Sequence, residues 1–173
     1  MELSILDFIQ NTFSCAFMDV IMPAISFLGN AGWVWILAGV VMAVIPKTRK
    51  IGITVCIALL LSLIVCNLTL KPIVNRIRPY DIKEGIELLI TKPHDASFPS
   101  GHSSASFAAA VAMVLYNKKI GIPAVVLASL IAFSRLYLYV HFPTDVLGGI
   151  ILGSLCAVGA YFIGKFLFKK IKI

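Results

Sequence analysis

The chain has 173 residues, of which 60% are hydrophobic and only 13% charged, and its mean hydropathy is +0.97. This composition excludes a soluble domain with a polar surface, so most of the surface must face lipid. A net charge of +7 would favour nucleic-acid binding in a soluble protein, but in a membrane protein basic residues mark cytoplasmic loops and bound anions. The length predicts one domain spanning residues 1–173.

The N-terminal segment, residues 1–28, differs from the rest in its acidic interruptions. Glu2, Asp7 and Asp19 break the apolar run, and the apolar residues between them recur on one helical face. This pattern favours an interfacial helix followed by a short inserted helix, and a sixth membrane crossing is the alternative. The first 46 residues contain no Lys or Arg, so the basic start of a cleavable signal peptide is missing.

Five later segments are apolar enough to cross a bilayer, which takes about 20 residues of helix when flanking residues are included. We therefore predict an all-α, polytopic membrane helix bundle of five to six transmembrane helices. The five segments are Gly32–Ile45, Ile51–Leu70, Ser103–Tyr116, Ile120–Phe133 and Val146–Gly164.

The basic residues orient these segments. Clusters at residues 46–50, 117–119 and 169–172 fall on one side of the predicted bundle, which the positive-inside rule assigns to the cytoplasm of a cell (plasma) membrane, together with the C-terminus. The connections Lys71–His102 and Ser134–Asp145 then face the non-cytoplasmic side, although they also carry Lys and Arg. A basic cluster on the side where topology disfavours it indicates that the cluster binds an anion.

Two motifs occur in the first of these connections. Residues 71–79, Lys-Pro-Ile-Val-Asn-Arg-Ile-Arg-Pro, could form a snorkelling basic belt at a helix end. Residues 99–102, Pro-Ser-Gly-His, begin a helix, and Ser100 there could simply cap it. The same helix start could bind phosphate, because its free N–H groups and the positive end of the helix dipole point outward.

The third motif, residues 134–145, joins the last two spans. Pro143 suits the first turn of the final helix, which places His141 just before the helix and Asp145 inside its first turn. Asp145 could be a first-turn acid that complements the helix dipole, and His141 an interface residue. Alternatively, His141 is a nucleophile whose second ring nitrogen donates to Asp145. All three motifs fall on the same face, which makes them a candidate functional site.

At these residues the chain resembles the type 2 phosphatidic acid phosphatase (PAP2) superfamily, and in particular small bacterial lipid phosphatases such as undecaprenyl-diphosphate phosphatases. The family signature consists of Lys, six residues and Arg-Pro; then Pro-Ser-Gly-His; then Ser-Arg, five residues, His, three residues and Asp. The matching residues are Lys71, Arg78-Pro79, Pro99-Ser100-Gly101-His102, Ser134-Arg135, His141 and Asp145, and no signature position departs.

The resemblance implies a phosphate-binding site without metal or cofactor. Lys71, Arg78 and Arg135 would neutralise charge on the equatorial phosphate oxygens, while Ser100 and the amide of Gly101 would add hydrogen bonds at a helix start. The carboxylates facing this side are scattered through a loop and predict no divalent-metal cluster.

The same resemblance implies three catalytic residues. His141 would attack phosphorus and form a phosphohistidine, and Asp145 would orient it. His102 would protonate the leaving oxygen and then activate water.

Several neighbouring residues are interpreted as supporting the membrane environment. Arg76 could snorkel or touch substrate, and Tyr80, Tyr137 and Tyr139 suggest an aromatic interface belt. His94-Asp95 suggests a solvated turn. The glycines in the first two turns of the last helix predict close helix packing around the site.

The predicted function is hydrolysis of a lipid phosphate or diphosphate, with undecaprenyl diphosphate favoured. Phosphatidylglycerophosphate, phosphatidic acid and lipid A are alternative substrates. Transfer of the phosphate to another acceptor, as in a lipid-linked phosphotransferase, would use the same phosphoenzyme. A non-catalytic anion-binding membrane protein would need ionisable residues near the bilayer midplane, and the span interiors contain essentially none. The expected partners are the lipid substrate and membrane lipids, and no nucleic acid.

Overall fold

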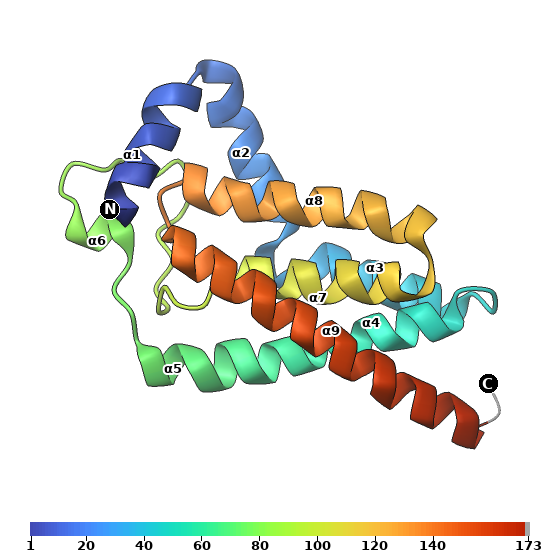
Figure 1. The fold of residues 1–173 in the computed structure, drawn as a ribbon. Coiled ribbons are helices and arrows are strands. Elements are labelled where there is room, and N and C mark those ends of the chain that lie inside the picture. Colours follow the sequence, from blue (N-terminus) through green and yellow to red (C-terminus); the bar gives the residue numbers. More distant parts are fainter. Residues whose placement is uncertain (172–173) are drawn as a thin grey trace.

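A computed structural model describes residues 1–171, and within them it contains helices and connecting turns but no strand. The helices form a bundle whose long axes run roughly side by side (Figure 1). In chain order the elements are α1 (Glu2–Phe13), α2 (Ala16–Leu28), η1 (Asn30–Gly32), α3 (Trp33–Val44), α4 (Arg49–Ser62), η2 (Leu63–Leu70), α5 (Lys71–Val74), α6 (Pro79–Ile82), α7 (Gly101–Tyr116), α8 (Lys118–Tyr137) and α9 (Pro143–Ile171).

Helix α7 lies at the centre of the bundle and packs against α4, α8 and α9, while α3 packs against α4 (Figure 1). Its inner positions are small and fully buried, including Ala108 and Ala112, so neighbouring backbones approach closely. On α9, a Cβ added to Gly153 would lie 2.2 Å from the backbone oxygen of Ser104, and one added to Gly149 would lie 2.6 Å from that of Ser100. These glycines therefore set the spacing of α7 and α9 beside the Pro-Ser-Gly-His motif.

Among residues 1–171, three stretches are long and apolar enough to span a bilayer: Arg49–Ile82, Lys118–Tyr137 and Pro143–Lys170. The pair Ala16–Leu28 and Asn30–Val44, bent by 44°, passes the same test as a single broken span. Helix α7, with 16 residues, is shorter, and its packing against α4, α8 and α9 holds it inside the bundle. All five predicted spans are helical, and the prediction of an all-α membrane bundle is confirmed.

The two ends of the bundle differ in what they carry. The α3–α4 connection, the α7–α8 connection and the end of α9 lie at one end, and the segments that hold the three signature motifs lie at the other (Figure 1). The predicted separation of basic clusters from signature motifs is therefore present in the fold. Lys172, part of the predicted cytoplasmic tail, lies outside the described residues, and the assignment of either end to the cytoplasm stays a prediction.

The N-terminal helices cover the signature end of the bundle. Helix α1 contacts α8 and α9, and α2 packs across α8 (Figure 1). The chain then turns through η1 into α3. The interfacial position predicted for α1 stays a prediction, but the structure places both α1 and α2 against the elements that carry the third motif.

Candidate active site

The first motif places two cations beside a carboxylate. Lys71 begins α5, and Arg78 precedes α6 as its N-cap residue. The Lys71 ammonium donates to the Asp95 carboxylate and to the backbone oxygen of Ala96, at 3.1 Å. The Arg78 guanidinium donates to Asp95 Oδ1 at 2.7 Å and to the backbone oxygen of Asp95 at 2.8 Å.

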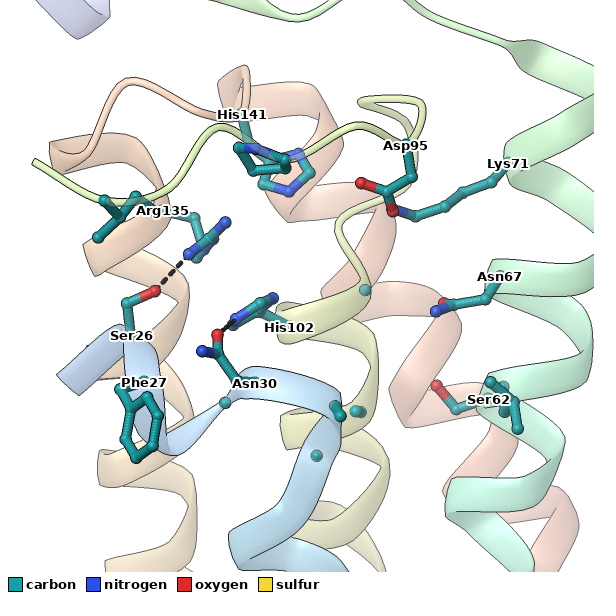
Figure 2. Close-up of a pocket in the computed structure, with 18 of the residues that line it drawn as sticks. Ser26, Phe27, Asn30, Ser62, Asn67, Lys71, Asp95, His102, Arg135 and His141 are labelled. Atoms are coloured by element: carbon teal, nitrogen blue, oxygen red, sulfur yellow. Dashed lines mark hydrogen bonds and ion pairs between the residues drawn. The ribbon is translucent and has the colours of Figure 1, made fainter. Parts of the chain in front are cut away.

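Asp95 lies in an exposed turn, as the sequence suggested, and its side chain is 54% exposed. Its carboxylate lies beside Lys71 (Figure 2) and forms ion pairs with both Lys71 and Arg78. Burial raises the pKa of Asp95, but hydrogen bonds and charges from Lys71 and Arg78 outweigh this effect and lower the pKa to about 2. The Asp95 carboxylate is thus ion-paired with two of the cations that are predicted to bind phosphate. The signal that could have found it is its position seven residues before His102 on the signature face.

The second motif begins the central helix as predicted. Ser100 is the N-cap of α7, and its hydroxyl accepts from the backbone N–H of Ser103 at 3.4 Å and the Ser103 hydroxyl at 3.0 Å. Its backbone N–H donates to the backbone oxygen of Asp145 at 3.0 Å, which ties the second motif to the third. Gly101 and His102 line the cavity described below, whereas Ser100 lies behind its wall, and the predicted contact of Ser100 with phosphate stays a prediction.

The third motif surrounds His141. Arg78 donates to the backbone oxygen of Val140 at 2.6 Å, and its Nη1 lies 3.3 Å from His141 Nε2. His141 Nδ1 lies 3.6 Å from Asp145 Oδ2, longer than a hydrogen bond, and finds no hydrogen-bond partner in the part of the chain that the structure describes. A donor at Nε2 and a carboxylate near Nδ1 favour the tautomer with its proton on Nδ1. Nε2 then carries the lone pair on the cation side.

Burial, together with the charges of Arg78 and Arg135 and against the opposing effect of Asp145, lowers the pKa of His141 to about 3. The imidazole is consequently neutral at physiological pH. A neutral ring is the form whose lone pair can attack phosphorus.

Asp145 is held by donors on three sides. Arg76 Nη1 donates to Oδ1 at 2.6 Å, while the Ser97 hydroxyl and the Phe142 backbone N–H donate to Oδ2 at 2.5 and 2.8 Å. Arg76 therefore neither snorkels nor lines the cavity: it holds the carboxylate beside His141. Glu2 on α1 completes this group, because its carboxylate accepts from Arg76 at 2.5 Å and from the Thr144 hydroxyl at 2.6 Å.

Arg135, near the end of α8, is the third predicted cation. Its Nη1 donates to the Ser26 hydroxyl on α2 (Figure 2), and its buried Nε has no hydrogen-bond partner among residues 1–171. Within the described residues it forms no ion pair with a carboxylate. A buried guanidinium with an unused donor is expected where an anion binds.

One cavity of about 1140 Å³ joins these groups. At its polar end lie Lys71, Arg78, His102, Arg135 and His141, so six of the eight predicted site residues line it when Gly101 is included. Asp145 and Ser100 lie one layer behind. The buried charged and catalytic side chains, with their exposed fractions, are Lys71 (6%), Arg78 (3%), Arg135 (2%), His141 (1%) and Asp145 (0%).

The other end of the cavity is apolar. It runs between α2 and α3 on one side and α4 and η2 on the other, and Phe27, Ile36, Leu60 and Leu63 on its walls are themselves exposed at the apolar surface of the bundle. The cavity therefore joins a buried cationic centre to a surface that faces lipid.

The predicted aromatic interface belt is wrong for Tyr137 and Tyr139. Both are fully buried beneath the N-terminal helices, where their hydroxyls donate to Asp19 at 2.5 Å and to Asp7 at 2.7 Å. The Tyr80 hydroxyl donates to the backbone oxygen of Pro93 at 2.6 Å. Asp7 and Asp19, which the sequence marked only as interruptions of an apolar run, therefore anchor α1 and α2 to the third motif.

The sequence pattern also missed Ser26, Asn30 and Ser97. Each contacts a signature residue, and the signature itself contains no sign of them because they lie in other segments. Within residues 1–171, no group of three or more His, Cys, Asp or Glu side chains could hold a metal ion. Metal independence stays a prediction that requires an assay.

Comparison with known proteins finds a family match over the part of the chain that carries the signature residues. Residues 51–169 match the PAP2 superfamily. The undecaprenyl-diphosphatase of Sulfolobus acidocaldarius is 35% identical over 131 residues, which are 74% of this chain and 63% of that protein. Undecaprenyl-diphosphatase BcrC of Bacillus subtilis is 31% identical over 78% of this chain and 69% of that protein. The chain thus spans about two thirds of the length of these relatives.

Two solved structures are similar over nearly the whole fold. The crystal structure of Aquifex aeolicus LpxE superposes with a TM-score of 0.81 and 28% identity, covering 92% of this chain and 93% of that one. The transmembrane PAP2-type phosphatidylglycerolphosphate phosphatase of Bacillus subtilis gives a TM-score of 0.69 and 28% identity, covering 98% and 87%. The cationic cavity, the signature residues that line it and these matches lead to one conclusion: the chain belongs to the PAP2 superfamily.

Proposed function

We propose that this chain is a membrane lipid phosphatase that hydrolyses a lipid phosphate or diphosphate through a phosphohistidine on His141. The observation that carries the proposal is the single cavity whose buried end holds His141, His102 and three cations and whose other end is apolar and faces lipid. A lipid headgroup fits the first end and its tail the second. The relatives named as undecaprenyl-diphosphatases support the same class.

In the first half-reaction, His141 Nε2 attacks phosphorus while Asp145 stabilises the proton on Nδ1. A P–N bond forms as the bond from phosphorus to the leaving oxygen breaks. Lys71, Arg78 and Arg135 neutralise the charge on the equatorial oxygens. Asp95 must release Lys71 and Arg78 for the phosphate to reach them, since both cations donate to its carboxylate.

In the second half-reaction, water displaces His141 from phosphorus. His102 enters the first step as an imidazolium and donates a proton to the leaving oxygen, then accepts one from the attacking water in the second step, so the ring returns to its starting state. Inorganic phosphate leaves, and the lipid alcohol or lipid monophosphate is the other product. This chemistry needs no redox partner, and we propose that it needs no metal or cofactor.

Undecaprenyl diphosphate is the favoured substrate. A diphosphate has a phosphate monoester as its leaving group, so it depends less on His102 than a monoester of an alcohol does. Phosphatidylglycerophosphate, phosphatidic acid and lipid A are the alternatives. Lipid A is included because the Bacteroides thetaiotaomicron lipid A 4'-phosphatase is 29% identical over 90% of this chain. We also propose that the site opens on the non-cytoplasmic side and that α9 ends in the cytoplasm, since basic clusters lie at the opposite end from the signature motifs.

The test is phosphate release by the purified protein in detergent with EDTA present. Undecaprenyl diphosphate, phosphatidylglycerophosphate and phosphatidic acid are compared, with His141→Ala as the control. Release that survives EDTA and is absent in His141→Ala supports the proposal and ranks the lipids. Release that EDTA abolishes, or that His141→Ala retains, contradicts it.

A further inference from the structure

The turn between α2 and α3 lies directly beside His102. Asn30 Oδ1 is 2.9 Å from His102 Nε2, and this is the hydrogen bond that the His102 side chain makes within residues 1–171. In Figure 2, the His102 ring lies between Asn30 on one side and Arg135 and His141 on the other. Asn30 also lines the cavity. It belongs to the N-terminal segment, which carries no signature residue.

The backbone of this turn is shaped around the His102 ring. A Cβ added to Gly29 would lie 2.6 Å from His102 Cδ2 and 2.8 Å from a methyl group of Ile131, so any larger residue there would displace the His102 ring or Ile131. Ala31 and Gly32 adopt left-handed conformations with φ of 49° and 67°, which is unfavourable for alanine. Asn30 itself is not among the residues with positive φ, so its side chain can be changed without backbone strain.

We infer that Asn30 is a positioning residue for His102 that fixes which ring nitrogen exchanges the proton during lipid phosphate hydrolysis. The inference rests on the proposed function. An amide oxygen has no proton to give, so Asn30 Oδ1 accepts from an Nε2–H. Nε2 keeps its proton in both half-reactions. The ring enters the first as an imidazolium, the form that a bound phosphate dianion favours, Nδ1 gives its proton to the leaving oxygen, and Nδ1 regains a proton from water in the second.

This arrangement supports the general acid in two ways. It holds the plane of the ring, because a hydrogen bond at Nε2 and the tight contact with Gly29 restrict rotation. It also keeps the neutral ring in the tautomer with a free Nδ1 lone pair, which the water step needs. Removing the amide should therefore act only through His102.

A purely structural role for Asn30 would produce a different pattern. Loss of packing at the α2–α3 turn would lower activity on every substrate and would add to the effect of losing His102. Loss of a positioning contact should lower the rate of the first half-reaction only for a leaving group that needs a proton, and should have no effect once His102 is gone.

The experiment compares Asn30→Ala, His102→Ala and the double variant on two substrates, phosphatidic acid and p-nitrophenyl phosphate. The first has an alkoxide leaving group that needs a proton, and the second a phenolate that does not. We expect Asn30→Ala to lower kcat/KM, which reports the first half-reaction and excludes the later water step, by about tenfold or more on phosphatidic acid and by less than about threefold on p-nitrophenyl phosphate. In the double variant, kcat/KM on phosphatidic acid should equal that of His102→Ala.

Two further variants control the result. Asn30→Asp keeps an acceptor at Oδ1 and should restore kcat/KM on phosphatidic acid to well above that of Asn30→Ala. Asn11→Ala, on α1, should behave as wild type. All variants should melt within about 4 °C of wild type in detergent.

Equal losses on the two substrates, additive losses in the double variant, or an Asn30→Asp variant no better than Asn30→Ala would each overturn the inference. None of these outcomes would touch the proposed function. That function fails separately, if wild type and His141→Ala release phosphate at the same rate.

Discussion

The segment Lys71–Asp145 and the first 46 residues contribute to the site in different ways. The former holds every signature residue, including the nucleophile His141 and the acid His102 of the proposed mechanism. The latter holds none, yet three of its side chains each contact a different group across the site. Those contacts are Glu2 with Arg76, Ser26 with Arg135 and Asn30 with His102.

The difference shows what a spacing pattern can reveal. Reacting groups must be particular residue types, because attack on phosphorus and neutralisation of its oxygens need imidazole, guanidinium and ammonium groups. Groups that hold them need only an acceptor at the right place, which many residue types and many segments can supply. The comparison therefore predicts large losses for changes in the signature and smaller, specific losses for changes in the N-terminal helices.

The largest effect is expected for His141→Ala. It removes the attacking nitrogen, so phosphate release should fall by about a thousandfold or more on every lipid. Steady-state phosphate release in detergent measures this. His94→Ala is the matched control, because His94 is exposed in the loop before α7 and does not line the cavity. Substantial activity in His141→Ala, or an equal loss in His94→Ala, would contradict the claim that the signature residues carry the reaction.

Arg76→Ala should have the next largest effect. Arg76 donates to the fully buried Asp145 carboxylate, and losing a hydrogen bond to a charged group costs about 2 kcal/mol. We expect a lower melting temperature and a loss of activity of about tenfold or more, because His141 loses its fixed partner.

Glu2→Ala tests the N-terminal side of the same contact. Glu2 is partly exposed, and its ion pair with Arg76 should contribute about 1 kcal/mol or less. Its loss should be clearly smaller than that of Arg76→Ala in both thermal unfolding and activity. A Glu2→Ala variant as damaged as Arg76→Ala would mean that α1 does more than support Arg76.

Asp95→Asn should moderately strengthen anion binding, whereas the other changes are expected to lower activity. The Asp95 carboxylate holds Lys71 and Arg78, so its removal should tighten competitive inhibition by inorganic phosphate severalfold while lowering the melting temperature. With a pKa of about 2, Asp95 remains ionised from about pH 5 to about pH 8, so the gain should not vary across that range. Weaker inhibition by phosphate would contradict competition between Asp95 and the substrate.

Ser26→Ala should have the smallest effect. It removes the acceptor of the Arg135 Nη1 hydrogen bond and leaves the guanidinium in the cavity wall. A single hydrogen bond contributes about 1 kcal/mol, so activity should fall by less than about tenfold. The matched variant is Arg135→Ala, whose loss should be much larger. Equal losses in the two would place Ser26, contrary to the comparison, among the groups that contact phosphate.

Much of the fold could be predicted because membrane spans are read from apolar length alone. The five predicted segments are helical, Ser100 caps α7, and Pro143 begins α9. The start of α3 was harder to predict. Helices α2 and α3 together form one bent span, and the left-handed turn at Ala31 and Gly32 joins them. No periodicity marks such a bend.

The polar residues outside the signature could not be placed for a related reason. Asp95 is solvated, as its sequence neighbours suggested, but nothing in its own segment shows that two cations from another segment bind its carboxylate. Tyr137 and Tyr139 looked like interface residues because nothing in their own segment shows that α1 and α2 cover them. Contacts between segments far apart in sequence decide both cases, and one sequence contains no direct record of such contacts.

The most direct test of the central claim is to trap the phosphoenzyme. Wild type and His102→Ala are quenched during turnover of the preferred lipid, and mass spectrometry locates the added phosphate under conditions that preserve phosphohistidine. Phosphate should be found on His141, at higher occupancy in His102→Ala because water attack is slower there. Phosphate on any other residue, or none on His141 in either protein during turnover, would contradict the proposed mechanism.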